Sequence, residues 1–280
     1  MPINADFSDE IDWTHLSNIV YAYDKHCLKM FSSKRTEIVF NPNSPITEEQ
    51  KKLQHPTGLT MCVVLGVSAF MKSLPAFYSL RRNTRNYLCK TNIRPLIFPN
   101  IHELNQSCYS EAWQVEYINR FLPFNQQKSL LFSLFLKTEI YDATWKFICG
   151  PELYERFTLC ENLGKSLWFN DPIIIRVWFV ILFFSTPLHY RSDGLIVTPV
   201  LKKKQIVLQT QNIYADLLWK YLIHRYGTPD CYRIFTNLVR VYIQMQTVGF
   251  NMYLKLKSEQ ELKTTNETLD KLVTSGIKQE

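Results

Sequence analysis

Glycine is scarce in this chain, and its scarcity argues against some folds. Only eight of the 280 residues are glycine, and long stretches contain neither glycine nor proline. An α/β fold needs glycine in the tight loops that join strands to helices, whereas an α-helical fold does not. The composition therefore predicts an all-α protein. Because 46% of the residues are hydrophobic and 20% are charged, the chain can bury one large core, and we expect a single domain over residues 1–280.

Paired cysteines are also lacking. The cysteines lie far apart, without a C-x-x-C motif and without a cluster of cysteine and histidine at ligand spacing. We therefore expect no zinc module and no metal site. An odd number of cysteines in mostly apolar surroundings suits buried, reduced thiols of a cytosolic or nuclear protein. The seven are Cys27, Cys62, Cys89, Cys108, Cys149, Cys160 and Cys231.

Recognisable catalytic motifs are missing as well. The six histidines never recur as H-x-x-x-H or H-E-x-x-H, and the chain contains no G-x-S-x-G, G-x-G-x-x-G or phosphate-binding P-loop motif. The acidic residues form no readable pair. We therefore do not expect an enzyme, although catalytic groups can assemble in space from distant positions.

No segment is apolar enough over a sufficient length to suggest a membrane span. The most apolar run, Ile173–Phe184, contains Arg176 and falls short of the ~20 residues that cross a bilayer. We expect it to form a central core helix. The first ten residues lack the basic start and apolar core of a signal peptide. The sequence thus indicates neither membrane insertion nor secretion.

The charge balance is basic, with a formal net charge of +7. Lysine and arginine are spread along the chain, and Lys202–Lys204 is the only run of them. A spread of this kind favours a solvated basic surface over a nucleic-acid groove. Because no zinc module is expected either, we expect no direct contact of this chain with DNA.

Helical spacing of apolar residues recurs along most of the chain. We expect a mobile connection over 32–52, because Asn-Pro and Ser-Pro pairs interrupt it, and a polar linker over 258–280. Gly227 suits the end of a helix, and Pro172 the start of one. The expected helices are 9–31, 58–74, 105–121, 126–148, 151–169, 172–184, 204–226 and 231–257.

The segment FMKSLPAFYSLRRNTRNYLCKTNI, which begins at Phe70, resembles the signature of the nuclear receptor ligand-binding domain. It departs from that signature at Thr84 and Arg85, where the family has Asp-Gln. The later helices follow in the family's order, so the resemblance covers Glu10 to about Lys257. It implies a three-layer antiparallel helical sandwich of about 10–12 helices. The matching residues are Phe70, Lys72, Ser73, Leu74, Pro75, Phe77, Leu80, Leu88 and Lys90.

The resemblance also implies an apolar ligand pocket between the family's third and fifth helices. Leu104 stands where the family has an arginine that binds carboxylate ligands, so a small neutral lipophilic ligand, or none, is expected. Pro95 and Pro99 are expected to interrupt the fifth helix. The implied pocket residues are Thr60, Val63, Val64, Val67, Ile97 and Ile101. No other cofactor is implied.

A second implied site is a groove for coregulator peptides that carry an amphipathic leucine-rich helix. Lys72 and Lys90 would flank the groove, and Lys72 would bind the carbonyls at the peptide's C-terminal end. The family closes the groove with a glutamate of its terminal activation helix, but Lys271 holds that position here. Glu267 and Asp270 could substitute for it. The implied apolar walls are Val67, Phe77, Leu80 and Leu88.

The signature also has a rival placement. Val115–Phe135 spaces Leu122-Pro123, Gln127 and Leu130-Leu131 in a similar way. The segment Phe70–Lys90 is preferred for its contiguous K-S-L-P-x-F and its two lysines. That choice makes the connection between the family's fifth and eighth helices longer than usual.

The last long helix predicts a dimer. Its apolar residues spread so far around the helix that one core can hardly cover them all, and the resemblance implies a symmetric contact here. The chain is thus expected to be the ligand-binding and dimerisation domain of a nuclear transcription regulator, as a homodimer or with another nuclear receptor. The alternatives are a ligand-independent dimerisation or corepressor module without a DNA-binding domain, and a helical enzyme. The expected contact residues are Phe235, Leu238, Val239, Tyr242 and Met245.

Overall fold

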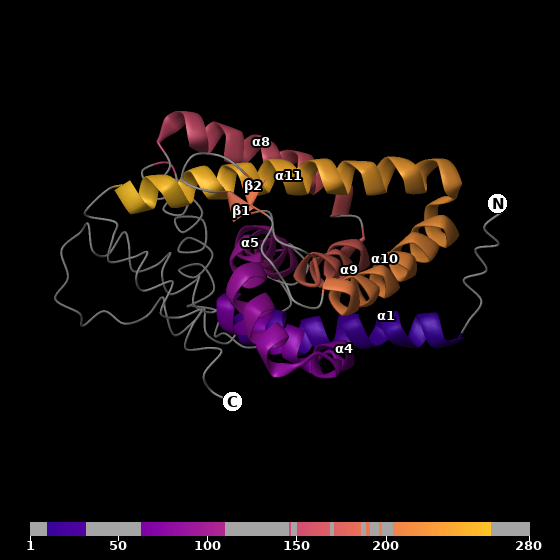
Figure 1. The fold of residues 1–280 in the computed structure, drawn as a ribbon. Helices are drawn as coiled ribbons and strands as arrows, with labels where there is room; N and C mark the ends of the chain where they lie inside the picture. Colours follow the sequence, from indigo (N-terminus) through magenta and orange to yellow (C-terminus); the bar gives the residue numbers. More distant parts are fainter. Residues whose placement is uncertain are drawn as a thin grey trace, which may run out of the picture.

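Almost all of the described chain is helical (Figure 1). The predicted all-α class is confirmed. The short strands β1, His189–Tyr190, and β2, Ile196–Val197, pair antiparallel and are the departure from it among the described residues. The structure is a computed structural model that describes residues 10–31, 63–109, 146, 150–168, 171–185, 189–190, 196–197 and 204–258.

Helix α9, Pro172–Phe183, is the centre of the fold. Its side chains from Ile174 to Phe183 are all buried, because other helices surround it. Asp171 caps its N-terminus, where the Oδ1 atom accepts a hydrogen bond of 3.0 Å from the backbone N–H of Ile173. The other carboxylate oxygen of Asp171 accepts hydrogen bonds from the hydroxyls of Tyr221 and Tyr226. The prediction of a central core helix is confirmed.

Helix α1, Glu10–Tyr23, runs on into a π-helical turn, η1, Asp24–Leu28. A further helix, residues 63–73, passes close to η1. At the crossing, a Cβ atom added to Gly66 would lie 3.0 Å from the carbonyl oxygen of His26 and 3.4 Å from the Cα of Cys27. Gly66 therefore permits a close approach that a side chain would obstruct.

Replacing Gly66 with alanine is expected to destabilise the fold. In most helices the change would stabilise by up to about 1 kcal/mol, because alanine is the better helix former. Here the new methyl group meets the backbone oxygen of His26, and overpacking of this kind costs about 1–3 kcal/mol. The free energy of unfolding in urea measures the change.

Gly249 supplies a matched control for this substitution. It lies inside helix α11, Thr228–Ser258, and an added Cβ atom would meet nothing within 4 Å. Gly249→Ala is therefore expected to raise the free energy of unfolding. A rise with Gly66→Ala as well would show that the two helices do not approach as closely as described.

The predicted signature segment folds into two helices that meet at a sharp corner. Helix α4, Pro75–Ser79, opens with its proline in the first turn, and α5, Arg82–Tyr109, follows after Leu80 and Arg81. The expected break at Pro95 and Pro99 was wrong, because α5 runs straight through both prolines. Its packing against α9 holds the helix together where each proline removes a backbone hydrogen bond.

The remaining helices are α8, Pro151–Trp168, and α10, Lys204–Tyr226, besides α11. Gly227 joins α10 to α11 with a φ of 77°, a left-handed conformation that glycine adopts without strain. In Figure 1, α8 and α11 lie along the top, α5, α9 and α10 lie in the middle, and α1 and α4 lie at the bottom. The contacts of α9 with α1, α5, α8 and α10 agree with this order.

Several expected segments lie outside the described residues. These are the connection 32–52, most of the helices expected over 105–121 and 126–148, the rival signature 115–135 and the linker after Ser258. Of the two expected helices, the described residues are 105–109, which form the end of α5, and Lys146.

Candidate functional site

The signature segment anchors the corner between α4 and α5 in the core. The ring of Phe77 lies 6.1 Å from that of Phe183 in α9. The guanidinium carbon of Arg85 lies over the same Phe77 ring, 5.4 Å from its centroid. Tyr78 packs edge-on against Phe77 at 5.7 Å but remains 62% exposed. The corner thus combines a buried aromatic anchor with an exposed ring and a cation.

The expected walls of the peptide groove are core residues. Val67, Phe77, Leu80 and Leu88 are all buried, so they do not offer the open apolar wall that the resemblance implied. Of the flanking lysines, Lys72 is partly buried and Lys90 is exposed. Glu267 and Asp270 lie outside the described residues.

The expected pocket residues that the structure describes also belong to the core. Val63, Val64 and Val67 from the 63–73 helix and Ile97 from α5 are buried in one hydrophobic cluster. Leu104, at the position of the family's arginine, is buried in the same cluster. Thr60 and the side chain of Ile101 are not among the residues whose placement is described. The structure therefore brings the apolar residues of the two helices together in its interior.

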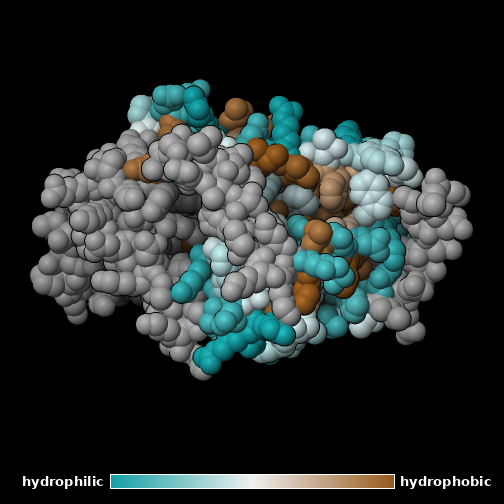
Figure 2. All heavy atoms as spheres, viewed as in Figure 1, coloured by the Kyte–Doolittle hydropathy of each residue, from teal (hydrophilic) through white to brown (hydrophobic). Residues whose placement is uncertain are grey.

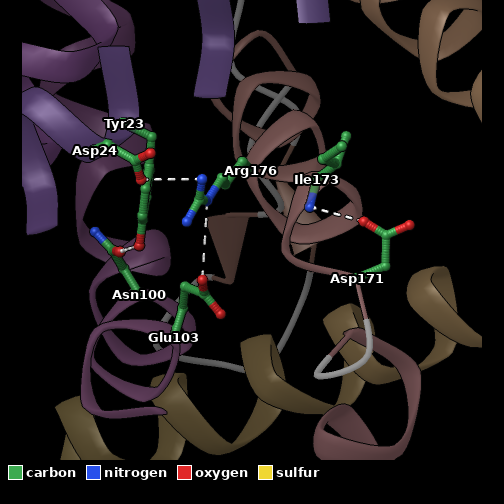
Figure 3. A network of polar contacts seen from close by, with 7 residues as sticks. All are labelled: Tyr23, Asp24, Asn100, Glu103, Asp171, Ile173 and Arg176. Carbon is green, nitrogen blue, oxygen red and sulfur yellow. Dashed lines mark hydrogen bonds and ion pairs between the residues drawn. The ribbon is translucent and has the colours of Figure 1, made fainter. Parts of the chain in front are cut away.

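A buried ionic cluster, which motif analysis did not find, connects three elements (Figure 3). Arg176 of α9 is buried, and its Nη1 atom lies 3.0 Å from Oδ1 of Asp24 in η1. Its Nε atom lies 4.0 Å from Oε1 of the buried Glu103 in α5. Its guanidinium carbon lies 5.0 Å from the ring centroid of Tyr23, whose hydroxyl donates to Oδ1 of Asn100. The sequence signal was the lone arginine in an apolar run.

Burial is the main cause of the pKa shifts of two ionisable groups in and beside this cluster. It raises the pKa of the Asp24 carboxyl, although the nearby Arg176 acts in the opposite direction. Burial also raises the pKa of the neighbouring Cys27 thiol, which keeps the sulfur protonated and poorly nucleophilic. The cluster therefore joins η1, α5 and α9 through paired charges, and its role is structural.

Helix α11 divides the expected dimer residues between the core and the surface. Leu238 is only 1% exposed, so in the described chain it belongs to the core. Phe235 and Tyr242 pack against Trp178 of α9, with ring centroids at 5.7 and 6.5 Å. Met245 is partly buried against the core, whereas Val239 is exposed.

The exposed apolar residues of α11 form a stripe of their own. Tyr232, Val239, Ile243 and Leu254 are 37–56% exposed and follow one another at steps of seven, four and eleven residues. At 3.6 residues per turn these steps place all four on one face. We call them the α11 stripe. The same spacing is present in the sequence, but it could not be separated there from the buried face.

Comparison with known proteins does not assign the chain. Its sequence matches no protein-family model, and no curated protein matches it significantly. Within the described residues, no helix has the length and apolarity that a bilayer crossing requires. The same residues contain no group of three or more histidine, cysteine, aspartate or glutamate side chains placed to hold a metal ion.

Proposed function

We propose that this chain is the ligand-binding and dimerisation domain of a nuclear receptor-like transcription regulator that acts in the nucleus. The observation that carries the proposal is the fold of Phe70–Lys90. A helix ends at residue 73, Pro75 opens α4, and α5 follows at once. This is the order of helix, short turn and helix that the resemblance implies for these residues.

The arrangement of the described helices supports the same family. The three-layer antiparallel sandwich that we propose would have α8 and α11 in one outer layer and α1 and α4 in the other. The middle layer would contain α5, α9 and α10, as their positions in Figure 1 suggest. The apolar run of α9 would fill the centre of that layer, where it is covered on both sides.

Coregulator peptides with amphipathic leucine-rich helices are the proposed partners of the region around Lys72 and Lys90. Ammonium groups there would favour the carbonyl end of a bound helix, through its dipole and charge-assisted hydrogen bonds. Because the expected apolar walls are buried, we expect weak binding that depends strongly on the two lysines.

Replacing Lys72 and Lys90 together with alanine is expected to lower the affinity for such a peptide. The probe is a fluorescein-labelled helix with the motif Leu-x-x-Leu-Leu, and its fluorescence anisotropy is followed in a titration with the purified protein. Losing two charge-assisted contacts at an exposed site should weaken binding by roughly threefold to thirtyfold.

The control variant replaces Lys25 and Lys29, two exposed lysines of the N-terminal helix, with alanine. It changes the net charge equally and should bind as the unmodified protein does. Equal affinity of all three proteins would contradict the proposed peptide site. No binding by the unmodified protein would favour a module that dimerises without recruiting such peptides.

A ligand-independent dimerisation or corepressor module is the second candidate function. Leu104 favours it, because this buried leucine replaces the arginine that would bind an acidic ligand. The valines expected to line a pocket are themselves packed in the core. Native mass spectrometry of the purified protein separates the two functions. A small lipophilic molecule that copurifies in stoichiometric amount supports ligand binding, and its absence supports the second candidate.

The proposed homodimer or heterodimer with another nuclear receptor would form through the α11 stripe. Tyr232, Val239, Ile243 and Leu254 leave an apolar face on the surface that a second copy of the helix could cover. A two-fold contact would place the same four residues on both sides.

A further inference from the structure

The stretch between Glu49 and Glu103 contains the net positive charge of the chain, because it has no acidic residue. Residues 50–102 contain eight of the 32 lysines and arginines and none of the 25 acidic residues. The rest of the chain therefore has 24 basic and 25 acidic side chains and is close to neutral. Counting charge over the whole chain conceals this imbalance.

Three arginines of that stretch gather at the corner where α4 meets α5. Arg81 and Arg82 are exposed, and Arg85 is partly buried. None of the three forms an ion pair with a described residue, and the buried Nε atom of Arg85 has no hydrogen-bond partner there. Figure 2 shows hydrophilic side chains along the lower edge of the molecule, where Figure 1 places α4.

Two exposed arginines on other helices differ, because each has an acidic neighbour. Arg156 of α8 lies 2.8 Å from Glu152, and Arg233 of α11 lies 2.9 Å from Asp230. These pairs are local, at spacings of four and three residues along their helices. The three arginines at the corner have no acidic residue close in sequence that could pair with them.

The position of the three arginines in α5 is unfavourable for the isolated fold. Arg81 precedes the helix, Arg82 is its first residue, and the backbone N–H of Arg85 donates to the carbonyl of Arg81 in the first turn. This end of a helix carries the positive end of the dipole, where acidic residues are favoured and cations are not. The first turn of α5 contains no acidic residue. An anionic partner would offset this local repulsion.

Aromatic side chains complete the surface. The guanidinium carbon of Arg85 lies 5.4 Å from the ring centroid of Phe77 and 5.5 Å from that of Tyr78. Both contacts restrict the guanidinium group, which lowers the entropy lost when it binds an anion. Because most of the Tyr78 ring is exposed, it offers an apolar contact beside the charges.

We propose that Arg81, Arg82, Arg85 and Tyr78 form a docking surface for an acidic polypeptide segment, which we call the α5 arginine surface. Its carboxylates would bind the arginines, and an apolar residue between them would cover Tyr78. The surface is compact, since its three arginines lie within five consecutive residues at the start of α5. A nucleic acid would instead engage phosphates along a longer basic track. The inference does not depend on the proposed receptor function.

The test compares two double variants of the full chain that lower the net charge by the same amount. Arg81→Gln with Arg82→Gln removes cations from the α5 arginine surface, and Arg156→Gln with Arg233→Gln removes them elsewhere. The probe is a short fluorescein-labelled peptide of glutamates with two leucines, followed by fluorescence anisotropy at low salt. The first variant should bind it about tenfold more weakly, and the second within about twofold of the unmodified protein.

Three further measurements make the proposal refutable. The same peptide with glutamine in place of glutamate should bind at least about tenfold more weakly, because the recognition is electrostatic. The midpoint of thermal unfolding of the first variant should stay level or rise, since cations leave the positive end of the helix. Equal binding by both double variants, or tighter binding of a single-stranded oligonucleotide than of the acidic peptide, would overturn the proposal.

Discussion

Replacing Arg176 with alanine is expected to reduce the free energy of unfolding by about 3–5 kcal/mol, because it removes the cation of a buried ionic cluster. Arg176 lies in the central helix α9, 3.0 Å from Asp24 and 4.0 Å from Glu103, and Glu103 is buried. The change takes the positive charge away from the buried Glu103 carboxylate, which does not gain water in exchange, and from Asp24, whose side chain is 46% exposed. Urea unfolding followed by circular dichroism measures the loss.

A surface pair is the matched control for this prediction. Arg156 and Glu152 form an ion pair of 2.8 Å with both side chains exposed, so Arg156→Ala should change the free energy of unfolding by no more than about 1 kcal/mol. The contrast tests burial, because both substitutions remove an arginine from a carboxylate.

The double variant Arg176→Met with Glu103→Gln distinguishes the ionic cluster from ordinary packing. It removes one positive and one negative charge and keeps side chains of similar length. If the interaction is electrostatic, the double variant should be more stable than Arg176→Met alone by about 1 kcal/mol or more. If the double variant is no more stable than Arg176→Met alone, the effect of Arg176 would instead come from its packing over the Tyr23 ring.

Local signals in the sequence predicted most of the helix boundaries. Pro172 starts α9 as expected, because a proline suits the first turn. Gly227 ends α10 as expected, because the chain must adopt a positive φ there. Such boundaries depend on residues close in sequence, so they can be identified without knowledge of the fold.

Other features depend on tertiary contacts and could not be predicted in this way. Pro95 and Pro99 lie within a continuous α5 because the helix packs on α9, which outweighs the local preference to break. Likewise, nothing in the spacing of residues in the π-helical turn η1 distinguishes it from the α1 helix before it. Tertiary packing thus outweighed the local signals in α5.

The candidate site residues also show which features a sequence can predict and which depend on tertiary contacts. Phe77 and Leu88 matched a signature, but a match does not say whether a side chain is a groove wall or part of the core, and both are buried. The arginines of the α5 arginine surface were overlooked for another reason. Their lack of ion pairs becomes visible only when exposure and side-chain contacts are known, whereas Arg156, Arg176 and Arg233 each form an ion pair.

On α11, the substitutions Ile243→Glu and Leu238→Ala are expected to have different effects, which separate the surface of the helix from its core. Leu238 is buried, so Leu238→Ala should lower the free energy of unfolding by about 2–5 kcal/mol through the cavity it leaves. Ile243 is 47% exposed, so Ile243→Glu should leave the fold nearly as stable. In the proposed dimer, however, the new carboxylate would lose its hydration inside an apolar contact.

Analytical ultracentrifugation decides whether the α11 stripe is an interface. The unmodified protein is expected to sediment as a dimer, and Ile243→Glu as a folded monomer with the helical signal intact. Thr247, one turn after Ile243, lies on the face of the α11 stripe itself. The control for an added charge is therefore Ser17→Glu, at an exposed residue of α1 on the opposite side of the molecule from α11 (Figure 1). If the double variant Ile243→Glu with Val239→Glu is still a dimer, the contact lies elsewhere. If the unmodified protein is a monomer, the homodimer is refuted, because the α11 stripe then stays exposed in solution.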